Sequence, residues 1–272
     1  MAIEYAAKYA GKVDERFALA SKTANAVNND YDWNGVDTVK VYTIPTVALG
    51  DYSMTGGNRY GTPAELQNTA QTMLLTQDKA FTFTIDRKSE DDTNGAMEAG
   101  KALRREIDEV VIPTIDKYRL AAMVAGAGKT ATAAITEANA YGAFLDAQNE
   151  LLENGVPETG RKAFVSPAFY KAIKMDASFM KASDVAQDML VNGSVGIVDG
   201  VNIIPVPASY LPANVAFILV HPMAVVSPIK LESYKMHDNP PGINGQLIEG
   251  RIRYDAFVLN GKKGAVYAHK NA

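Results

Sequence analysis

The sequence predicts an α+β fold in which an α/β lobe is inserted into a domain made of one long helix and C-terminal strands. Apolar residues with helical spacing run from Leu103 to Ala122, and strand-like alternation frames a long polar segment at residues 50–77. Alternation returns near the C-terminus. We therefore expect four parts: an N-terminal arm (1–37), an extended two-stranded loop (38–88), a helix-and-strand domain in two pieces (89–129 and 223–272), and the inserted lobe (130–222).

The N-terminal segment has a loose helical stripe of apolar residues between positions 3 and 28. The polar sequence Asn28–Asp30 then interrupts it, so a helical arm is predicted to end there. Trp33 is the only tryptophan of the chain, and we expect it to be a buried anchor rather than a ligand-stacking residue.

The next segment reads as a strand that leaves the fold and returns. Thr38–Val47 and Lys79–Asp86 both alternate between apolar and polar residues, and residues 50–77 between them are polar and contain glycine. A two-stranded arm is marginally stable by itself, and an unstructured loop of this length is unusual inside a compact domain. We therefore expect this arm to rest on a second copy of the chain.

A long helix is predicted from Asn94 to Val124, about 45 Å in length. Ser89 is the expected helix cap, and Pro113 should produce a kink or a break because it lacks a backbone N–H. Charged residues on this helix have i,i+4 spacing and are expected to form ordinary surface pairs that could set the register between subunits: Arg104 with Asp108 and Arg105 with Glu109.

The inserted lobe combines short helices and strands, with turn residues between them. The expected elements are a helix at Thr132–Asn154 ended by Gly155, a strand at Ala163–Ser166, a helix opened by Pro167, a helix at Ser183–Val191, a hairpin turn at Asp199-Gly200 and a central strand at Val215–His221.

The C-terminal segment is expected to form strands at Val225–Met236 and Gln246–Leu259 that return to the long helix. Residues 237–245, with two prolines and two glycines, have the composition of an exposed loop. Asn260-Gly261 is interpreted as a second hairpin turn.

Composition excludes several classes of protein. The 272 residues are 47% hydrophobic and 21% charged, as in a globular chain, and the net charge of −4 argues against a protein whose main task is to bind phosphate backbones. The chain has no cysteine, and its three histidines lie far apart in the sequence, so we expect no metal and no cofactor. Neither a signal peptide nor a membrane-spanning stretch is found, which predicts a soluble protein made in a cytoplasm, without a membrane partner.

Only one motif invites an enzymatic interpretation. AGAGKT at residues 125–130 resembles a phosphate-binding loop, but Met123 stands where the first glycine is required and the motif follows a helix rather than a strand. We interpret it as the glycine-capped end of the long helix. No catalytic residues are therefore expected.

The order of these elements, together with six short segments, resembles the major capsid proteins of tailed bacteriophages with the Hong Kong 97-like fold. The segments are VYTIPTVALGDY (41–52), GGNRYGTPAEL (56–66), DKAFTFTID (78–86), VVIPTIDKYR (110–119), VDGVNIIPVP (198–207) and RIRYDAFVLNGKKGAVYA (251–268). Each is weakly specific alone, but they occur in the right order along the whole chain. The resemblance makes the long helix the spine of a peripheral domain and the lobe an axial domain.

The resemblance implies a shell subunit that assembles as hexamers and pentamers into an icosahedral or prolate virion head around double-stranded DNA, in the cytoplasm of a host bacterium. It implies a portal, a decoration protein as a further candidate partner, and loose contact with the DNA. Two sets of residues are expected between subunits: Tyr52, Gly56, Gly57, Arg59, Tyr60, Gly61 and Glu65 of the extended loop, and Arg104, Arg105, Asp108 and Glu109 of the spine.

Two departures from some members of that family refine the expectation. No lysine occurs between Lys40 and Lys79, so the loop lacks the nucleophile of a lysine–asparagine cross-link and a non-covalent shell is expected. Some members carry a long N-terminal scaffold that is cleaved, whereas the arm before the first strand is short here, which predicts a separate scaffolding protein and little or no maturation cleavage.

Three alternatives remain open from the sequence. An encapsulin-type compartment would share the fold and present an inner pocket for a cargo peptide. A phosphate-binding α/β enzyme would use Lys129, and Lys129→Ala would abolish nucleotide binding. Another self-assembling phage component, such as a tail protein, would form open tubes.

Overall fold

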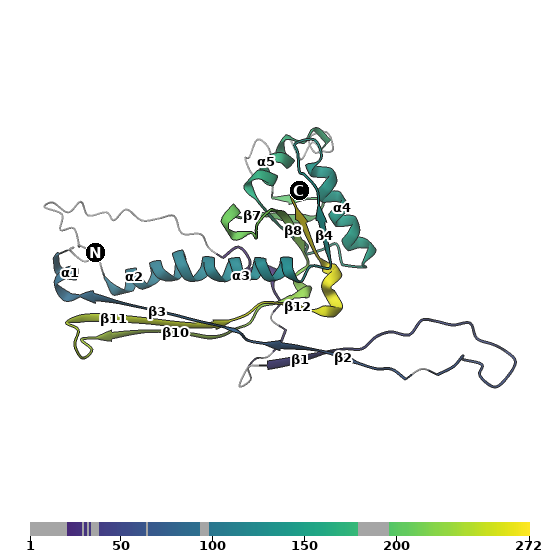
Figure 1. The fold of residues 1–272 in the computed structure, drawn as a ribbon, viewed down its shortest axis with the longest axis horizontal. Helices are drawn as coiled ribbons and strands as arrows, with labels where there is room; N and C mark the ends of the chain where they lie inside the picture. Colours follow the sequence, from purple (N-terminus) through teal and green to yellow (C-terminus); the bar gives the residue numbers. More distant parts are fainter. Residues whose placement is uncertain are drawn as a thin grey trace. The chain divides into compact units, whose positions relative to one another are not determined.

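The computed structural model describes residues 21–28, 30, 31, 33, 38–63, 65–92, 98–178 and 196–272. The chain divides into two compact units (Figure 1). Residues 33–75 form the smaller unit, and the remainder of the chain forms the larger one. Of the helical arm predicted at residues 3–28, residues 3–20 lie outside the described residues, and residues 21–28 contain a short 3₁₀ helix (Ala24–Ala26) instead of the predicted α-helix. The helix predicted at Ser183–Val191 also lies outside the described residues. The expected four-part division stays a prediction.

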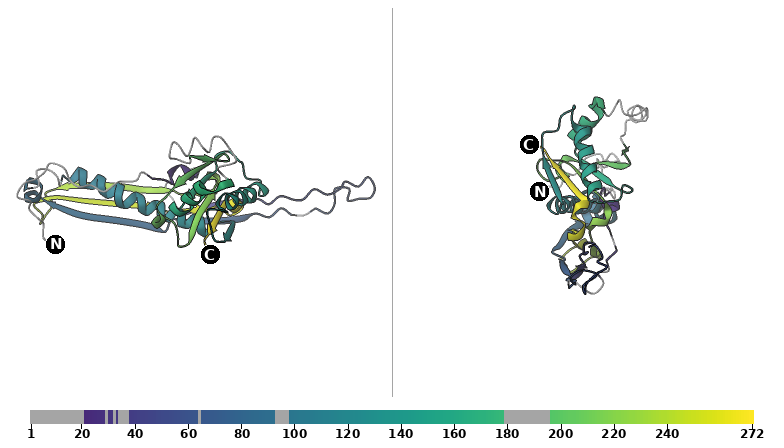
Figure 2. Two further views of the ribbon diagram at one scale, coloured as in Figure 1. Left: turned by 90° about the horizontal axis from the view of Figure 1, so that it is seen from above. Right: turned by 90° about the vertical axis from the view of Figure 1, so that its right-hand side faces the viewer.

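The smaller unit is a two-stranded antiparallel ribbon with a long connection. Strand β1 (Thr38–Thr43) pairs with β2 (Thr69–Leu74), so that Thr38 lies opposite Leu74 and Thr43 opposite Thr69. The connection at residues 44–68 continues beyond the paired strands as a long loop in Figure 2.

The predicted partner of the first strand was wrong. Strand β3 (Gln77–Asp86) exists as expected, but it belongs to the larger unit, where it pairs with β11 (Gly245–Tyr254). The reason is apolar burial. Phe81, Phe83 and Ile85 pack against the long helix in the larger unit, whereas in a two-stranded ribbon their side chains would stay exposed to water.

The long helix has three segments. Helices α2 (Ala99–Glu106) and α3 (Ile112–Ala125) are joined by a π-helical segment, η2 (Ile107–Val111), which places Pro113 in the first turn of α3. The N–H of Ile112 bonds to the carbonyl of Ile107, five residues earlier. The predicted interruption at Pro113 is therefore a π turn just before it, which adjusts the helical hydrogen-bond pattern around a residue without a donor.

The predicted cap at Ser89 was wrong, because Ser89 lies inside the short helix α1 (Arg87–Asp92). This helix follows β3 without a loop, and the side chain of Asp86 accepts a hydrogen bond from the Lys88 N–H at 2.9 Å. The carboxylate before the helix thus takes the capping role that was assigned to the serine.

The C-terminal strands pack on the long helix, as expected. Strand β10 (Ile229–Asp238) and β11 form a hairpin, and the three-stranded sheet has the order β10-β11-β3. Buried Ile252 and Tyr254 of β11 contact Val111 and Ile115 of the helix. Figure 2 shows the helix lying along this sheet.

The lobe contains a six-stranded mixed sheet in the order β4-β13-β8-β5-β7-β6. Its strands are β4 (Lys129–Thr132), β5 (Lys162–Val165), β6 (Ile197–Val198), β7 (Val201–Pro205), β8 (Val215–Val220) and β13 (Val266–Lys270). Every residue of β8 is buried and it pairs on both sides, which confirms the predicted central strand. Helices α4 (Ala140–Glu153) and α5 (Pro167–Met175) complete the lobe.

Of the two hairpin turns predicted from the sequence, one is confirmed and one was wrong. Asp199 and Gly200 have positive φ angles of 45° and 78° between β6 and β7, so the predicted hairpin is confirmed. Asn260-Gly261 instead begins a 3₁₀ helix (Asn260–Ala265) between β12 (Phe257–Val258) and β13. It is not a hairpin turn, because β12 pairs with β9 (Val225–Val226) while β13 enters the six-stranded sheet.

The helix predicted at Thr132–Asn154 begins only at Ala140. Only Thr132 of the predicted helix lies in β4, an edge strand parallel to β13, and the Asn139 side chain accepts a hydrogen bond from the Thr136 N–H at 2.7 Å. Strand pairing at Thr132 and this local side-chain hydrogen bond thus compete with the helix before Ala140. Gly155 follows the helix with a φ of 69°, as a C′ glycine should.

Candidate assembly interface

The tip of the extended loop is ordered by its own contacts. The rings of Tyr52 and Tyr60 meet edge to face with centroids 5.0 Å apart, and the Ser53 N–H donates to the Arg59 carbonyl at 3.0 Å. Gly56 and Gly61 have φ angles of 92° and 84°, which explains glycine at both positions. The connection therefore doubles back on itself at this tip.

All loop residues predicted to lie between subunits are solvent-exposed: Tyr52, Gly56, Gly57, Arg59, Tyr60, Gly61 and Glu65. The structure places them in the smaller unit, apart in the chain from the charged spine residues. Their contact with a neighbouring subunit stays a prediction.

The loop also exposes an apolar surface. Leu49 is fully exposed and Tyr60 is 92% exposed. The other large apolar side chains exposed in this unit are Tyr42, Ile44, Val47, Tyr52, Met54, Leu66 and Leu74. Burying one such side chain is worth about 1.5–3 kcal/mol. A partner that covered this surface would therefore gain substantial binding free energy.

Sequence reasoning missed the aliphatic members of this surface. It selected the glycines and tyrosines of the loop by their turn chemistry and overlooked Ile44, Val47, Leu49, Met54 and Leu66. The signal was present, because these residues interrupt a segment that otherwise has the composition of a solvated loop.

The charged residues of the spine form the two pairs that their spacing predicts. Arg105 lies 2.9 Å from Glu109, and Arg104 lies 3.8 Å from Asp108. Exposed pairs of this kind contribute at most about 1 kcal/mol. A role for them in subunit register stays a prediction.

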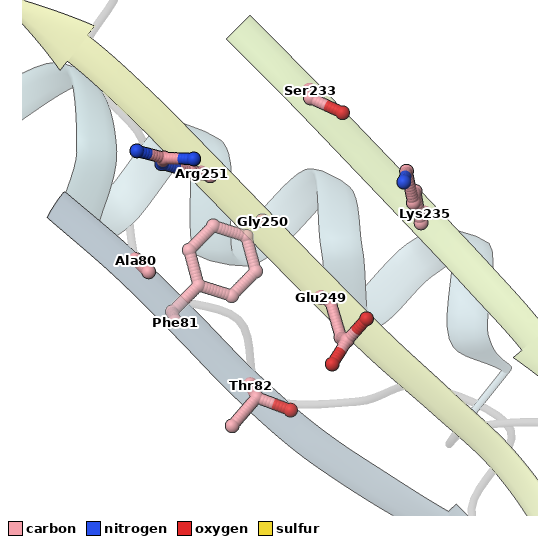
Figure 3. Close-up of a pocket in the computed structure, with 8 residues that line it drawn as sticks. All are labelled: Ala80, Phe81, Thr82, Ser233, Lys235, Glu249, Gly250 and Arg251. Atoms are coloured by element: carbon pink, nitrogen blue, oxygen red, sulfur yellow. The ribbon is translucent and has the colours of Figure 1, made fainter. Parts of the chain in front are cut away.

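The outer face of the three-stranded sheet carries a shallow groove (Figure 3). Its walls include Lys235 of β10 with Glu249 and Arg251 of β11. Arg251 makes two hydrogen bonds to Asp78, at 2.6 and 3.0 Å, and these bonds hold the pKa of Asp78 below its usual value. The groove therefore presents paired charges of both signs on one sheet face.

The AGAGKT segment is not a phosphate-binding loop. Helix α3 ends at Ala125, Gly126 follows as its C-cap, and Lys129 begins β4 at 3.8 Å from Glu150. A Cβ at Gly128 would lie 2.5 Å from the Lys263 carbonyl oxygen, so this glycine is needed for chain packing.

Two searches of the described residues gave negative results. No cluster of three His, Asp or Glu side chains that could hold a metal ion occurs in the described ranges. Among the helices described, none is both long and apolar enough to cross a membrane.

Solved structures of similar fold define the class of protein. A structure from Mycobacterium phage Che8 aligns with a TM-score of 0.73 at 17% identity, covering 96% of this chain and 95% of that one. The cyanophage P-SCSP1u capsid structure aligns at 0.78 with 13% identity, covering 98% and 93%. The mature capsid of bacteriophage PhiM1 aligns at 0.78 with 14% identity, covering 100% and 92%. The chain thus has the fold of phage capsid subunits.

Residues 67–268 match the family model described as phage capsid protein. The chain belongs to the phage capsid protein family. It is a structural protein of the virion head that associates with copies of itself into a shell, and it is not an enzyme. The search of curated proteins gave no match.

Proposed function

We propose that this chain is the major capsid protein of a tailed phage with the Hong Kong 97-like arrangement. Copies assemble as hexamers and pentamers into an icosahedral or prolate head that encloses double-stranded DNA. The observation that carries the proposal is the exposed apolar surface of the extended loop, which needs a neighbouring subunit to leave water.

In this proposal the part of the extended loop that lies in the smaller unit (38–75) lies across a neighbouring subunit, while β3 stays in the three-stranded sheet of its own subunit. The spine with the C-terminal strands (89–129 and 223–272, without β13) is the peripheral domain, and residues 130–222 together with β13 form the axial domain around the capsomer centre. The charges of Arg104, Arg105, Asp108 and Glu109 help to set the register between subunits.

The shell is held together without covalent cross-links, since residues 41–78 contain no lysine. Assembly in the host bacterial cytoplasm uses a separate scaffolding protein and a portal, and a decoration protein is a further candidate partner. The net charge of −4 favours loose contact with packaged DNA, because few phosphates are neutralised by an acidic chain.

The experiment that tests the proposal replaces residues 44–68 by Asn-Gly. Thr43 and Thr69 are directly paired, so a two-residue turn can join β1 to β2 without changing the ribbon. We expect a folded protein that forms no closed particles in electron microscopy under conditions in which the unchanged chain does. Shells of normal size would overturn the bracing role of the loop.

A full-length variant separates the apolar surface from loop length. Leu49→Ser, Met54→Ser and Tyr60→Ser together should prevent shell closure, because they remove apolar area without shortening the loop. The matched control changes exposed polar positions of the same loop, with Thr55→Ser, Asn58→Ser and Thr62→Ser, and should still form shells.

A further inference from the structure

A buried carboxylate of the spine holds the segment that precedes the smaller unit. Asp116 of α3 is 1% exposed. It accepts hydrogen bonds from the Ser21 hydroxyl at 2.8 Å, the Lys22 N–H at 2.8 Å and the Thr23 hydroxyl at 2.6 Å. The chain is thus tied to the spine shortly before it enters the extended loop.

A second buried carboxylate holds the chain where it returns. Thr76 is the first residue of the larger unit after the loop. Its N–H and its hydroxyl both donate to one oxygen of Asp255 at 2.8 Å, and the Tyr118 hydroxyl donates to the other at 2.8 Å. Asp255 is 2% exposed and lies directly after β11.

Two further side chains join these attachment points. Arg119, which is 5% exposed, donates to the Thr23 hydroxyl at 3.2 Å and to the Ser227 hydroxyl at 2.8 Å. Ser227 in turn donates to the Asp255 carbonyl at 2.8 Å. Burial lowers the pKa of Arg119 and the charge of Asp116 opposes this, but a guanidinium stays protonated in proteins. We call this set the root cluster: Thr23, Thr76, Asp116, Arg119, Ser227 and Asp255.

The hydrogen bonds of the root cluster fix one arrangement of the chain more narrowly than apolar packing alone would. Apolar side chains could fill the same space, whereas hydrogen-bonded buried groups have one satisfied arrangement and a cost for every other. Its bonds go to residues that flank the loop on both sides in the sequence. A continuous series of hydrogen bonds, from Thr23 through Arg119, Ser227 and Asp255 to Thr76, therefore connects the two flanks.

We propose that the root cluster is a positioning device that couples the two flanks of the extended loop, so that both are held or released together. The proposal rests on the bracing function proposed above. In this proposal Ser227 and Arg119 are positioning residues. They connect the two attachment points to each other and need not contact a neighbouring subunit.

The sharpest test is Ser227→Ala, because it breaks the link and leaves both attachment points chemically intact. Native-state amide hydrogen exchange on the unassembled chain should show faster exchange at the Lys22 and Thr76 amides, each by about tenfold, a change of about 1.4 kcal/mol in local opening. The matched control is Ser166→Ala, which also removes a buried hydroxyl bonded to the chain, at 3.2 Å from the Phe169 N. It should leave both amides unchanged.

A second variant, Thr23→Val, keeps the test decisive if Ser227→Ala does not fold. It should speed exchange at the Thr76 amide as well as near position 23. Faster exchange confined to residues 21–28 would show two independent attachments and overturn the coupling.

The assembly readout completes the test. Ser227→Ala and Thr23→Val should broaden the diameters of assembled particles, and Ser166→Ala should not. An unchanged distribution beside faster exchange would overturn the positioning role. If the unchanged chain forms no shells at all, the bracing function fails, while the exchange experiment still decides the coupling.

Discussion

Gly250 shows how a single position constrains the sheet under the spine. It lies opposite Phe81 in the register of β11 and β3, and a Cβ there would come within 2.3 Å of the Phe81 ring (Figure 3). The ring therefore occupies space that any larger residue at position 250 would need.

Gly250→Ala should lower the free energy of unfolding by about 1–3 kcal/mol, because the added methyl displaces the ring or the strand. Denaturant unfolding measures it. In the Phe81→Ala background the same change should cost less, since the clash is gone. Equal costs in both backgrounds would contradict the assigned contact.

The ionisation of Tyr118 makes part of the protein's stability depend on pH. Burial, followed by the hydrogen bond to Asp255, raises the pKa of Tyr118 above its usual 10.0. The folded state thus favours the protonated phenol, so this contribution is fully present below pH 10.0 and is lost as the pH rises through the raised value.

Tyr118→Phe should destabilise the protein by about 1–2 kcal/mol at neutral pH, because it removes a donor to a carboxylate. The difference between the two proteins should shrink above pH 10.0. Urea unfolding at several pH values measures it. Other tyrosines also have raised pKa values, including Tyr254 and Tyr267, so the comparison with the variant, rather than the alkaline loss itself, is the test.

At the scale of elements, the apolar residues of the spine are unevenly buried. Ile115 is 6% exposed and contacts the sheet through Ile252 and Tyr254, whereas Ile107, in the π-helical segment, is half-buried. The same apolar stripe therefore contains positions of very different importance.

Ile115→Asp should prevent folding, because an unpaired charge would be buried at a cost of several kcal/mol. Ile107→Asp should be milder and leave a folded protein with a lowered melting temperature. Circular dichroism melting compares the two, and equal losses would contradict the difference in burial.

The existence of most elements could be predicted from the sequence, since periodicity and turn residues are local signals. The spine, β3, the central strand β8 and the Asp199-Gly200 hairpin were found in this way. Their partners were not, because the pairing of β3 with β11 depends on residues far apart in the chain. The same limit hid Asp116 and Asp255, whose partners come from distant segments.

At the scale of the whole molecule, the composition of the loop predicts that the subunits of the shell are not covalently cross-linked. Particles dissolved in hot detergent and reducing agent should give one band near the chain mass of 29.2 kDa. The reason is the absence of a lysine at residues 41–78, so that the connection between β1 and β2 offers no amine for an isopeptide bond. A ladder of covalent multimers would show another cross-link and contradict the non-covalent shell.

By itself, the sequence determined the α+β composition, the long interrupted helix, the glycine-containing loop and the resemblance to capsid proteins, because these depend on local pattern and order along the chain. Only the tertiary structure decided which strands pair, which loop side chains stay in water, and how two buried carboxylates hold both flanks of the loop. Those properties depend on contacts between distant residues, and burial arises only when the chain has folded.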